Sequence, residues 1–162
     1  MLARVYGCGF PGIVSAIGLC ENGCQVTAID NQSTRVDELR AGKFWGGDLL
    51  LEQLIGKHLG SGLSFTSDPI QSDSCDFCVL SLPTSFEDGS LDLSVVINVC
   101  VKILTSENFV GKPTVLIRST LPLHGLKKIE QSIFEQMGKK SGLDWHVAYV
   151  PEFMRQGTGM DD

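Results

Sequence analysis

Short, continuous apolar runs alternate along the chain with stretches whose apolar residues recur at helical spacing. Continuous apolar runs are typical of parallel strands, because both faces of such strands are covered. The pattern predicts strands at residues 2–6, 25–29, 63–66, 77–82, 114–118 and 145–150. It predicts helices at residues 11–21, 33–41, 49–58, 93–104 and 126–137. The repeated strand–helix order predicts an α/β fold with a doubly wound parallel sheet and helices on both faces.

Polar residues and glycines mark several of the predicted helix ends. Ser33 and Asp92 stand where N-caps are expected, and Gly23 and Gly138 follow predicted helices. Ser and Asp side chains accept hydrogen bonds from the free N–H groups of a first turn, while glycine readily adopts the left-handed conformation that ends many helices. No linker divides the chain, so we expect one domain over residues 1–162.

Composition and charge exclude several classes of protein. The 162 residues are 43% hydrophobic and carry a net charge of −6, as expected of a folded domain and not of a disordered chain. The acidic balance and the lack of a basic stripe argue against nucleic-acid binding. No apolar run reaches the ~18 residues of a membrane-spanning helix. Glycines and Pro11 interrupt the one stretch near the N-terminus that imitates a secretion signal, so we expect a cytoplasmic protein without membrane attachment.

The six cysteines raise the question of metal or redox chemistry. Cys75-Asp-Phe-Cys78 has the C-x-x-C spacing of metal and redox sites. Cys78, however, falls inside a predicted buried strand, where a free Cys acts as a small hydrophobic residue. There is no second C-x-x-C, and the histidines are scattered at His58, His124 and His146. We therefore favour structural thiols over a zinc site and assign no metal ligands.

The strongest chemical motif is Gly7-Cys-Gly9-Phe-Pro-Gly12, between the first predicted strand and the first predicted helix. In a G-x-G-x-x-G loop the first glycine permits the tight turn, the second lets the backbone approach a pyrophosphate, and the third lets helix and strand pack closely. Pro11 suits the start of the helix, whose free N–H groups and dipole attract an anion. The alternative is a purely structural glycine turn. In this context the motif predicts a Rossmann-type, dinucleotide-binding fold.

Asp30 directly follows the second predicted strand, about 20 residues beyond Gly9. A carboxylate there accepts hydrogen bonds from the adenosine ribose hydroxyls and repels a 2′-phosphate, which favours NAD over NADP. Arg35 keeps NADP open, because a guanidinium beside the ribose can accommodate the extra phosphate. The alternative for Arg35 is a solvated charge on a helix.

Several motifs in a compatible order resemble the UDP-glucose/GDP-mannose dehydrogenase family, specifically its N-terminal NAD-binding domain. They cover nearly the whole chain, at residues 7–12 with Asp30, 79–84, 89–93, 118–122 and 151–157. The resemblance implies an enzyme that oxidises the C6 hydroxymethyl group of a nucleotide sugar to a carboxylate. The family does so in two NAD-dependent steps, through a cysteine thiohemiacetal and thioester.

The same resemblance implies roles for individual residues. The implied catalytic residues are Thr120, which would order a water, and Glu152, which would assist proton transfer. The alternatives are a helix N-cap for Thr120 and an exposed loop acid for Glu152. The implied cofactor-binding residues are Gly7, Gly9, Phe10, Pro11, Gly12, Asp30, Arg35, Leu82, Pro83, Thr84, Ser119 and Thr120. The implied substrate-binding residues are Phe153, Met154, Arg155 and Gln156.

The sequence also departs from the family pattern. Pro11 and Ser85 replace a usual Val and Pro, His124 stands where the family has glycine, and Gln156 replaces a second Glu. The chain stops at Asp162, before the family's central helix and its sugar-nucleotide domain with the nucleophilic Cys. We therefore expect a truncated NAD-binding domain that is inactive alone and meets a sugar nucleotide only if a C-terminal domain completes it.

Two other functions stay open at this point. One is a stand-alone, non-catalytic dinucleotide-binding or interaction module. The other is a Rossmann dehydrogenase of the 3-hydroxyacid type, against which the Pro151-Glu-Phe153 segment argues. Truncation would leave an apolar part of the sheet uncovered, which predicts a homo-oligomer.

Overall fold

The computed structural model describes residues 1–45, 48–68, 74–87, 89–105 and 111–155. Strands and helices alternate along this part of the chain, as the apolar pattern predicts. Their order is β1 (Leu2–Tyr6), α1 (Phe10–Glu21), β2 (Gln25–Ile29), α2 (Ser33–Arg40), α3 (Leu49–His58), β3 (Leu63–Thr66), β4 (Phe77–Leu80), β5 (Phe86–Glu87), β6 (Ser90–Leu91), α4 (Ser94–Thr105), β7 (Thr114–Ile117), α5 (Gly125–Met137) and β8 (His146–Tyr149).

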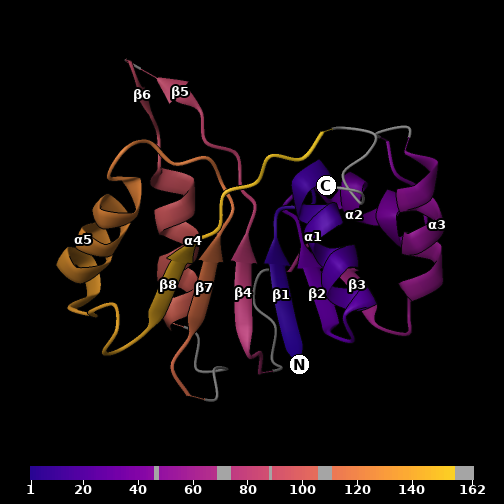
Figure 1. The fold of residues 1–162 in the computed structure, drawn as a ribbon, viewed down its shortest axis with the longest axis horizontal. Coiled ribbons are helices and arrows are strands. Elements are labelled where there is room, and N and C mark those ends of the chain that lie inside the picture. The colour runs from indigo at the N-terminus through magenta and orange to yellow at the C-terminus, as the bar shows by residue number, and fades with distance from the viewer. Residues whose placement is uncertain (46–47, 69–73, 88, 106–110, 156–162) are drawn as a thin grey trace.

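A parallel sheet of six strands runs through the molecule in the order β3-β2-β1-β4-β7-β8 (Figure 1). Tyr6 of β1 pairs with Ile29 of β2 and with Leu80 of β4, and Leu80 pairs in turn with Ile117 of β7. The carboxyl ends of these strands therefore lie level at one edge. The chain winds outward in both directions from β1 and β4, which confirms the doubly wound, Rossmann-type fold. Ligands of such sheets bind beside this switch point, at the carboxyl edge.

Helices cover both faces of the sheet, as predicted. One face buries Val5, Ala28 and Val79 against α1, α2 and α3. The opposite face buries Leu80 and Ile117 against α4 and α5. Figure 1 shows α1–α3 gathered at the β1–β3 half of the molecule and α4–α5 at the β7–β8 half. Within the described ranges, every helix is too short or too polar to cross a lipid bilayer.

The predicted helices and strands agree with the structure to within two residues at their ends. The short antiparallel pair β5–β6 was not predicted, because two-residue strands leave no periodic signal. The N-cap assigned to Ser33 is wrong: Ser33 is the first residue of α2, and Gln32 precedes it without a side-chain cap. The N-cap assigned to Asp92 is one residue off, because α4 begins at Ser94, but the Asp92 Oδ1 still accepts from the Ser94 N–H at 2.9 Å. Gly138 ends α5 in the predicted left-handed conformation, at φ 69°.

We predict that Gly12→Ala destabilises the fold, whereas Gly18→Ala, in the same helix, does not. A Cβ on Gly12 would lie 1.9 Å from the Gly7 carbonyl oxygen, while a Cβ on Gly18 meets no atom within 4 Å. Forcing backbone apart costs about 1–3 kcal/mol, and replacing a helical glycine by alanine gains up to about 1 kcal/mol. Urea unfolding of both variants measures the difference. Equal loss of stability in the two variants would contradict the close packing of α1 on the end of β1.

Candidate functional site

The glycine loop joins β1 to α1 at the carboxyl edge of the sheet. Gly7 has a φ of 95°, which favours glycine, and its N–H donates to the Ile29 carbonyl of β2 at 2.8 Å. A Cβ on Gly7 would lie 2.1 Å from the Ser81 carbonyl oxygen, and one on Gly12 would lie 1.9 Å from that of Gly7. The first and third glycines are therefore needed by the fold itself, for the turn and for the contact between helix and strand.

Gly9 differs from the other two glycines of the loop. Its φ of −67° and ψ of 177° suit any residue, and a Cβ there would meet no atom of the described part of the chain within 4 Å. Gly9 is also the N-cap of α1, and no side chain caps the helix. The space in front of Gly9 therefore adjoins the first N–H groups of a helix that has Pro11 in its first turn. This arrangement fits the pyrophosphate of a dinucleotide, which free helix N–H groups and the helix dipole attract.

Asp30 follows β2 and is 6% exposed. Its Oδ2 accepts from the Cys8 N–H at 2.8 Å and from Arg35 Nη1 at 2.9 Å, and its Oδ1 accepts from the Gln32 N–H at 2.9 Å. The carboxylate thus links the glycine loop to the start of α2. Carboxylate oxygens each accept more than one hydrogen bond, so this carboxylate can hold the loop and still accept from a ligand hydroxyl.

Phe10, Phe44 and Trp45 form an aromatic wall beside Asp30 that was not predicted from the sequence. The Arg35 guanidinium lies 4.9 Å from the ring centroid of Trp45, which is 47% exposed. Phe44 lies 4.8 Å from Trp45 and 6.4 Å from Phe10 between ring centroids. The only sequence signal for it was the adjacent aromatic pair Phe44-Trp45 shortly after α2. Arg35 is therefore not the solvated helix charge of the alternative.

The loops after β4 and β7 carry the next set of predicted cofactor residues. Buried Ser119 bridges them, because its Oγ accepts from the Leu82 N–H at 2.8 Å and lies 3.4 Å from the Leu80 carbonyl oxygen. Thr84 is half-buried, whereas Pro83 and Thr120 are exposed. The structure thus places these residues along the same edge as the glycine loop, with the Ser119 hydroxyl engaged in joining the two loops.

Thr120 does not cap α5. The N-cap is His124, whose φ of 62° and ψ of 12° are left-handed. His124 stands where the family pattern has glycine, and glycine adopts this conformation without the strain that a Cβ brings. The His124 side chain is exposed, and the helix-cap alternative for Thr120 is wrong.

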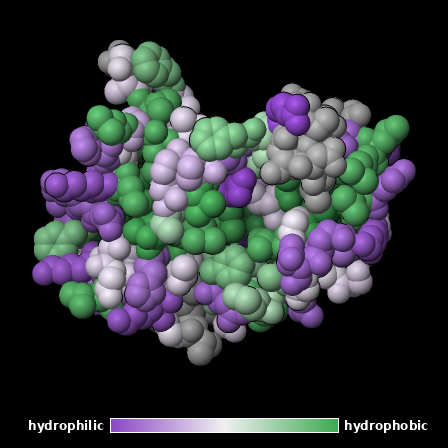
Figure 2. Space-filling model, in the orientation of Figure 1, coloured by the Kyte–Doolittle hydropathy of each residue, from purple (hydrophilic) through white to green (hydrophobic). Residues whose placement is uncertain are grey.

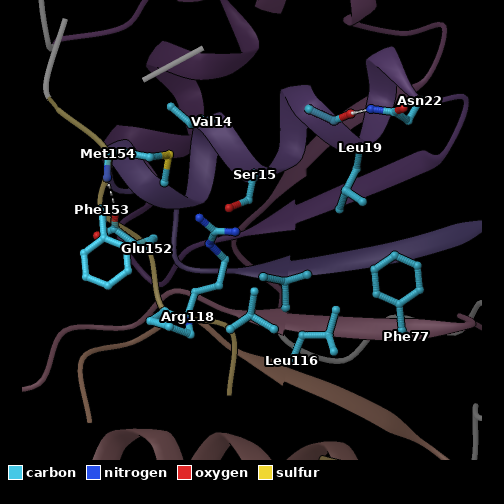
Figure 3. Close-up of a pocket in the computed structure, with 14 residues that line it drawn as sticks. Val14, Ser15, Leu19, Asn22, Phe77, Leu116, Arg118, Glu152, Phe153 and Met154 are labelled. Carbon is cyan, nitrogen blue, oxygen red and sulfur yellow. Dashed lines mark hydrogen bonds between the residues drawn. The ribbon is translucent and has the colours of Figure 1, made fainter. Parts of the chain in front are cut away.

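A cleft of about 680 Å³ opens between α1, the middle of the sheet and the segment after β8 (Figures 2 and 3). Leu116 and Phe77 form part of its apolar floor, and Arg118 reaches across it toward Ser15 of α1 (Figure 3). The Arg118 Nε is buried and has no hydrogen-bond partner among the residues that the structure describes. Figure 2 shows an apolar hollow in this face of the molecule.

The residues after β8 border this cleft. Glu152 is half-buried, and its Oε2 accepts from the Met154 N–H at 2.9 Å, so it is not a freely exposed loop acid. Met154 packs on the α1 core, whereas Phe153 is 88% exposed and Arg155 is exposed. The predicted substrate residue Gln156 lies outside the described residues.

The one cysteine of the glycine loop does not offer a reactive thiol at this edge of the sheet. Cys8 lies in the glycine loop, but its side chain is fully buried, and burial together with the Asp30 carboxylate raises its pKa to about 12. The six cysteines are all unpaired. Among the described residues, no three His, Cys, Asp or Glu side chains gather in one place.

Comparison with known proteins identifies the family. The model of the UDP-glucose/GDP-mannose dehydrogenase family, NAD binding domain, matches residues 1–162. The chain belongs to this family. The resemblance inferred from the motifs is thereby confirmed, and the 3-hydroxyacid alternative loses its support.

Relatives in this family are considerably longer than the chain. The GDP-mannose 6-dehydrogenase of Pseudomonas syringae pv. tomato is 32% identical over 169 residues, which cover the whole chain but 38% of that protein. The crystal structure of a ternary complex of GDP-mannose dehydrogenase from Pseudomonas aeruginosa matches with a TM-score of 0.85 and 30% identity, over 100% of the chain and 38% of its own. UDP-D-ManNAc dehydrogenase from Pyrococcus horikoshii shares the fold, with a TM-score of 0.89 and 22% identity over 99% and 38% of the two chains.

We predict that Asp30→Ala lowers the free energy of unfolding by about 1–3 kcal/mol without any cofactor, because it leaves the Cys8 N–H buried and unpaired. The matched control is Asp37→Ala in α2. The Asp37–Arg40 ion pair spans 3.6 Å between largely exposed side chains, so its loss changes stability by less than about 1 kcal/mol. Urea unfolding checks both values. A loss at Asp30 no larger than that at Asp37 would contradict the structural role of the carboxylate.

Proposed function

We propose that this chain is the NAD-binding portion of a nucleotide-sugar 6-dehydrogenase, which oxidises the C6 hydroxymethyl group of a UDP- or GDP-sugar to a carboxylate. The observation that carries the proposal is the open space at Gly9, beside uncapped helix N–H groups and the buried Asp30 carboxylate. Family membership supports the same reading, since the matching family domain is described as NAD-binding. NAD supplies a hydride acceptor to such a reaction.

Residues of the loop and of β2 would bind the adenosine half of NAD. Gly9 and Gly12 would face the pyrophosphate, with Phe10 and Pro11 shaping the start of the helix. Asp30 would accept hydrogen bonds from the ribose hydroxyls. The Arg35 guanidinium is already paired with Asp30 at 2.9 Å and stacked on Trp45. It is therefore less available for a 2′-phosphate, which favours NAD over NADP.

Residues after β4, β7 and β8 would lie beside the nicotinamide end of NAD, where the substrate reacts. Leu82, Pro83 and Thr84 would line the cofactor, with Ser119 holding the two loops together. Thr120 would order a water, and Glu152 would assist proton transfer, a role that needs a carboxylate held in place. The hydrogen bond from the Met154 N–H fixes one Glu152 oxygen, and the other would act on the substrate. Phe153, Met154, Arg155 and Gln156 would contact the sugar nucleotide.

The nucleophile of the family reaction would come from outside this chain. Cys8 is the cysteine of the glycine loop, and its raised pKa makes it a poor nucleophile, since the thiolate is the reactive form. This observation also favours the second candidate, a dinucleotide-binding module without catalysis. A cytoplasmic location and a homo-oligomeric state stay predictions.

We predict that Gly9→Val weakens NADH binding by at least about tenfold, the equivalent of 1.4 kcal/mol, while it costs no more than the roughly 1 kcal/mol of a poorer N-cap in stability. The Cβ of the valine would meet no atom of the described residues within 4 Å, so the side chain would enter the space proposed for the pyrophosphate. Gly56→Ala, on the exposed surface of α3, is the control and should bind NADH normally. Isothermal titration calorimetry gives the affinities. Unchanged affinity in both Gly9→Val and Asp30→Ala would refute the site.

We predict that the 162-residue chain binds NADH but forms none from NAD⁺ with GDP-mannose or UDP-glucose. NADH absorbance follows the reaction. Turnover by the chain alone would contradict the inference that none of its thiols acts as the nucleophile of the family reaction. Turnover that begins when the remaining portion of a relative is added as a separate polypeptide would reject the non-catalytic module, and its continued absence at saturating fragment would favour that module.

A further inference from the structure

Two thiols of the C-x-x-C motif face each other at the amino edge of the sheet, opposite the proposed cofactor site. The Sγ atoms of Cys75 and Cys78 are 3.7 Å apart. Residues three apart on a regular strand point to opposite faces. Here Cys75 precedes β4, and a bend at Asp76 turns it back over Cys78.

Hydrogen bonds to β1 hold this bend. The Asp76 N–H donates to the Leu2 carbonyl, and Asp76 Oδ2 accepts from the Leu2 N–H, both at 2.8 Å. The pairing of Asp76 with Leu2 therefore fixes the approach of the two thiols. A disulfide has an S–S distance of about 2.05 Å. The two sulfur atoms would therefore need to approach each other by less than about 2 Å to form the bond.

The two cysteines differ in access to solvent. Cys75 is 5% exposed and borders a cleft of about 460 Å³ together with Arg4 and Ser74. Cys78 is fully buried in the core beneath α4. A small oxidant entering the cleft would therefore meet Cys75 before the fully buried Cys78.

We infer that Cys75 and Cys78 form a reversible dithiol–disulfide site that small hydroperoxides oxidise. The Cys75 thiolate attacks a peroxide oxygen, the O–O bond breaks, and Cys75 becomes a sulfenic acid while hydroxide leaves and is protonated to water. The Cys78 sulfur then attacks the Cys75 sulfur, and the sulfenic oxygen leaves as a second water with the Cys78 proton. The peroxide gains two electrons and the dithiol loses two, so hydrogen peroxide yields one disulfide and two waters.

The electrostatics around the pair support this order of events. A hydrogen bond from the Cys78 thiol and the nearby Arg4 guanidinium lower the pKa of Cys75, against the opposing effects of burial and Asp76. The same hydrogen bond and burial raise the pKa of Cys78, with Cys75 and Cys100 adding to the rise. Cys75 is therefore the thiol that attacks, and Cys78 is the one that resolves.

Oxidation of the full chain tests the site. Limited hydrogen peroxide is followed by denaturation, alkylation of the remaining thiols and digestion with trypsin. Residues 58–102 form one tryptic peptide that also contains Cys100. We expect this peptide to lose two hydrogen atoms, with Cys100 alkylated, and dithiothreitol to restore both thiols. Fragment spectra assign the pair, and a Cys100→Ala variant should give the same disulfide.

Two variants separate the roles of the cysteines. Cys78→Ala should form no disulfide and should instead accumulate a Cys75 sulfenic acid that dimedone captures. Cys75→Ala should leave Cys78 reduced at the same peroxide dose. Cys20→Ala, a buried thiol outside the pair, should behave as the unchanged chain. The inference is overturned if Cys75 and Cys78 are both alkylated after oxidation of the unchanged chain, or if Cys75 pairs with Cys100.

Discussion

The contact on which the structure depends is the close approach of α1, the end of β1 and the loop after β4. A Cβ on Gly12 would lie 1.9 Å from the Gly7 carbonyl oxygen, and a Cβ on Gly7 would lie 2.1 Å from that of Ser81. Three backbone segments therefore meet with no room for side chains between them. This contact aims the first turn of α1 at the carboxyl edge of the sheet and places the strand-order reversal between β1 and β4 beneath it.

The Asp30 carboxylate, which follows β2, ties the glycine loop to that strand as well. Because its Oδ2 holds the Cys8 N–H, the loop cannot leave the sheet without unpairing a buried donor. Because the same oxygen also holds Arg35, the guanidinium stays over Trp45. One side chain thus positions both the anion-attracting helix end and the wall beside it. Gly9 takes no part in these contacts, so binding and stability can be separated at Gly9 but not at Asp30.

The sequence predicts the fold well because its strands are continuous apolar runs that both faces of the sheet bury, as at Phe77–Leu80. The glycine loop and Asp30 are also predictable, because each has one backbone or charge requirement at a fixed spacing. What the sequence does not reveal depends on contacts across the fold. The Ser119 bridge to Leu82, the left-handed His124, the Arg35–Trp45 stack and the meeting of Cys75 with Cys78 each join residues whose neighbours are set by tertiary packing.

The two chemical sites lie at opposite ends of the same two strands. β1 carries Arg4 toward the thiols and ends beside Gly7, while β4 begins beside Cys75 and ends before Ser81. A disulfide between Cys75 and Cys78 would close a small loop within one segment and would not bridge β1 and β4. It adds no link between Tyr6 and Leu80, whose backbones pair two residues beyond Arg4 and Cys78. The new covalent constraint would therefore stay within residues 75–78 and would add none between β1 and β4.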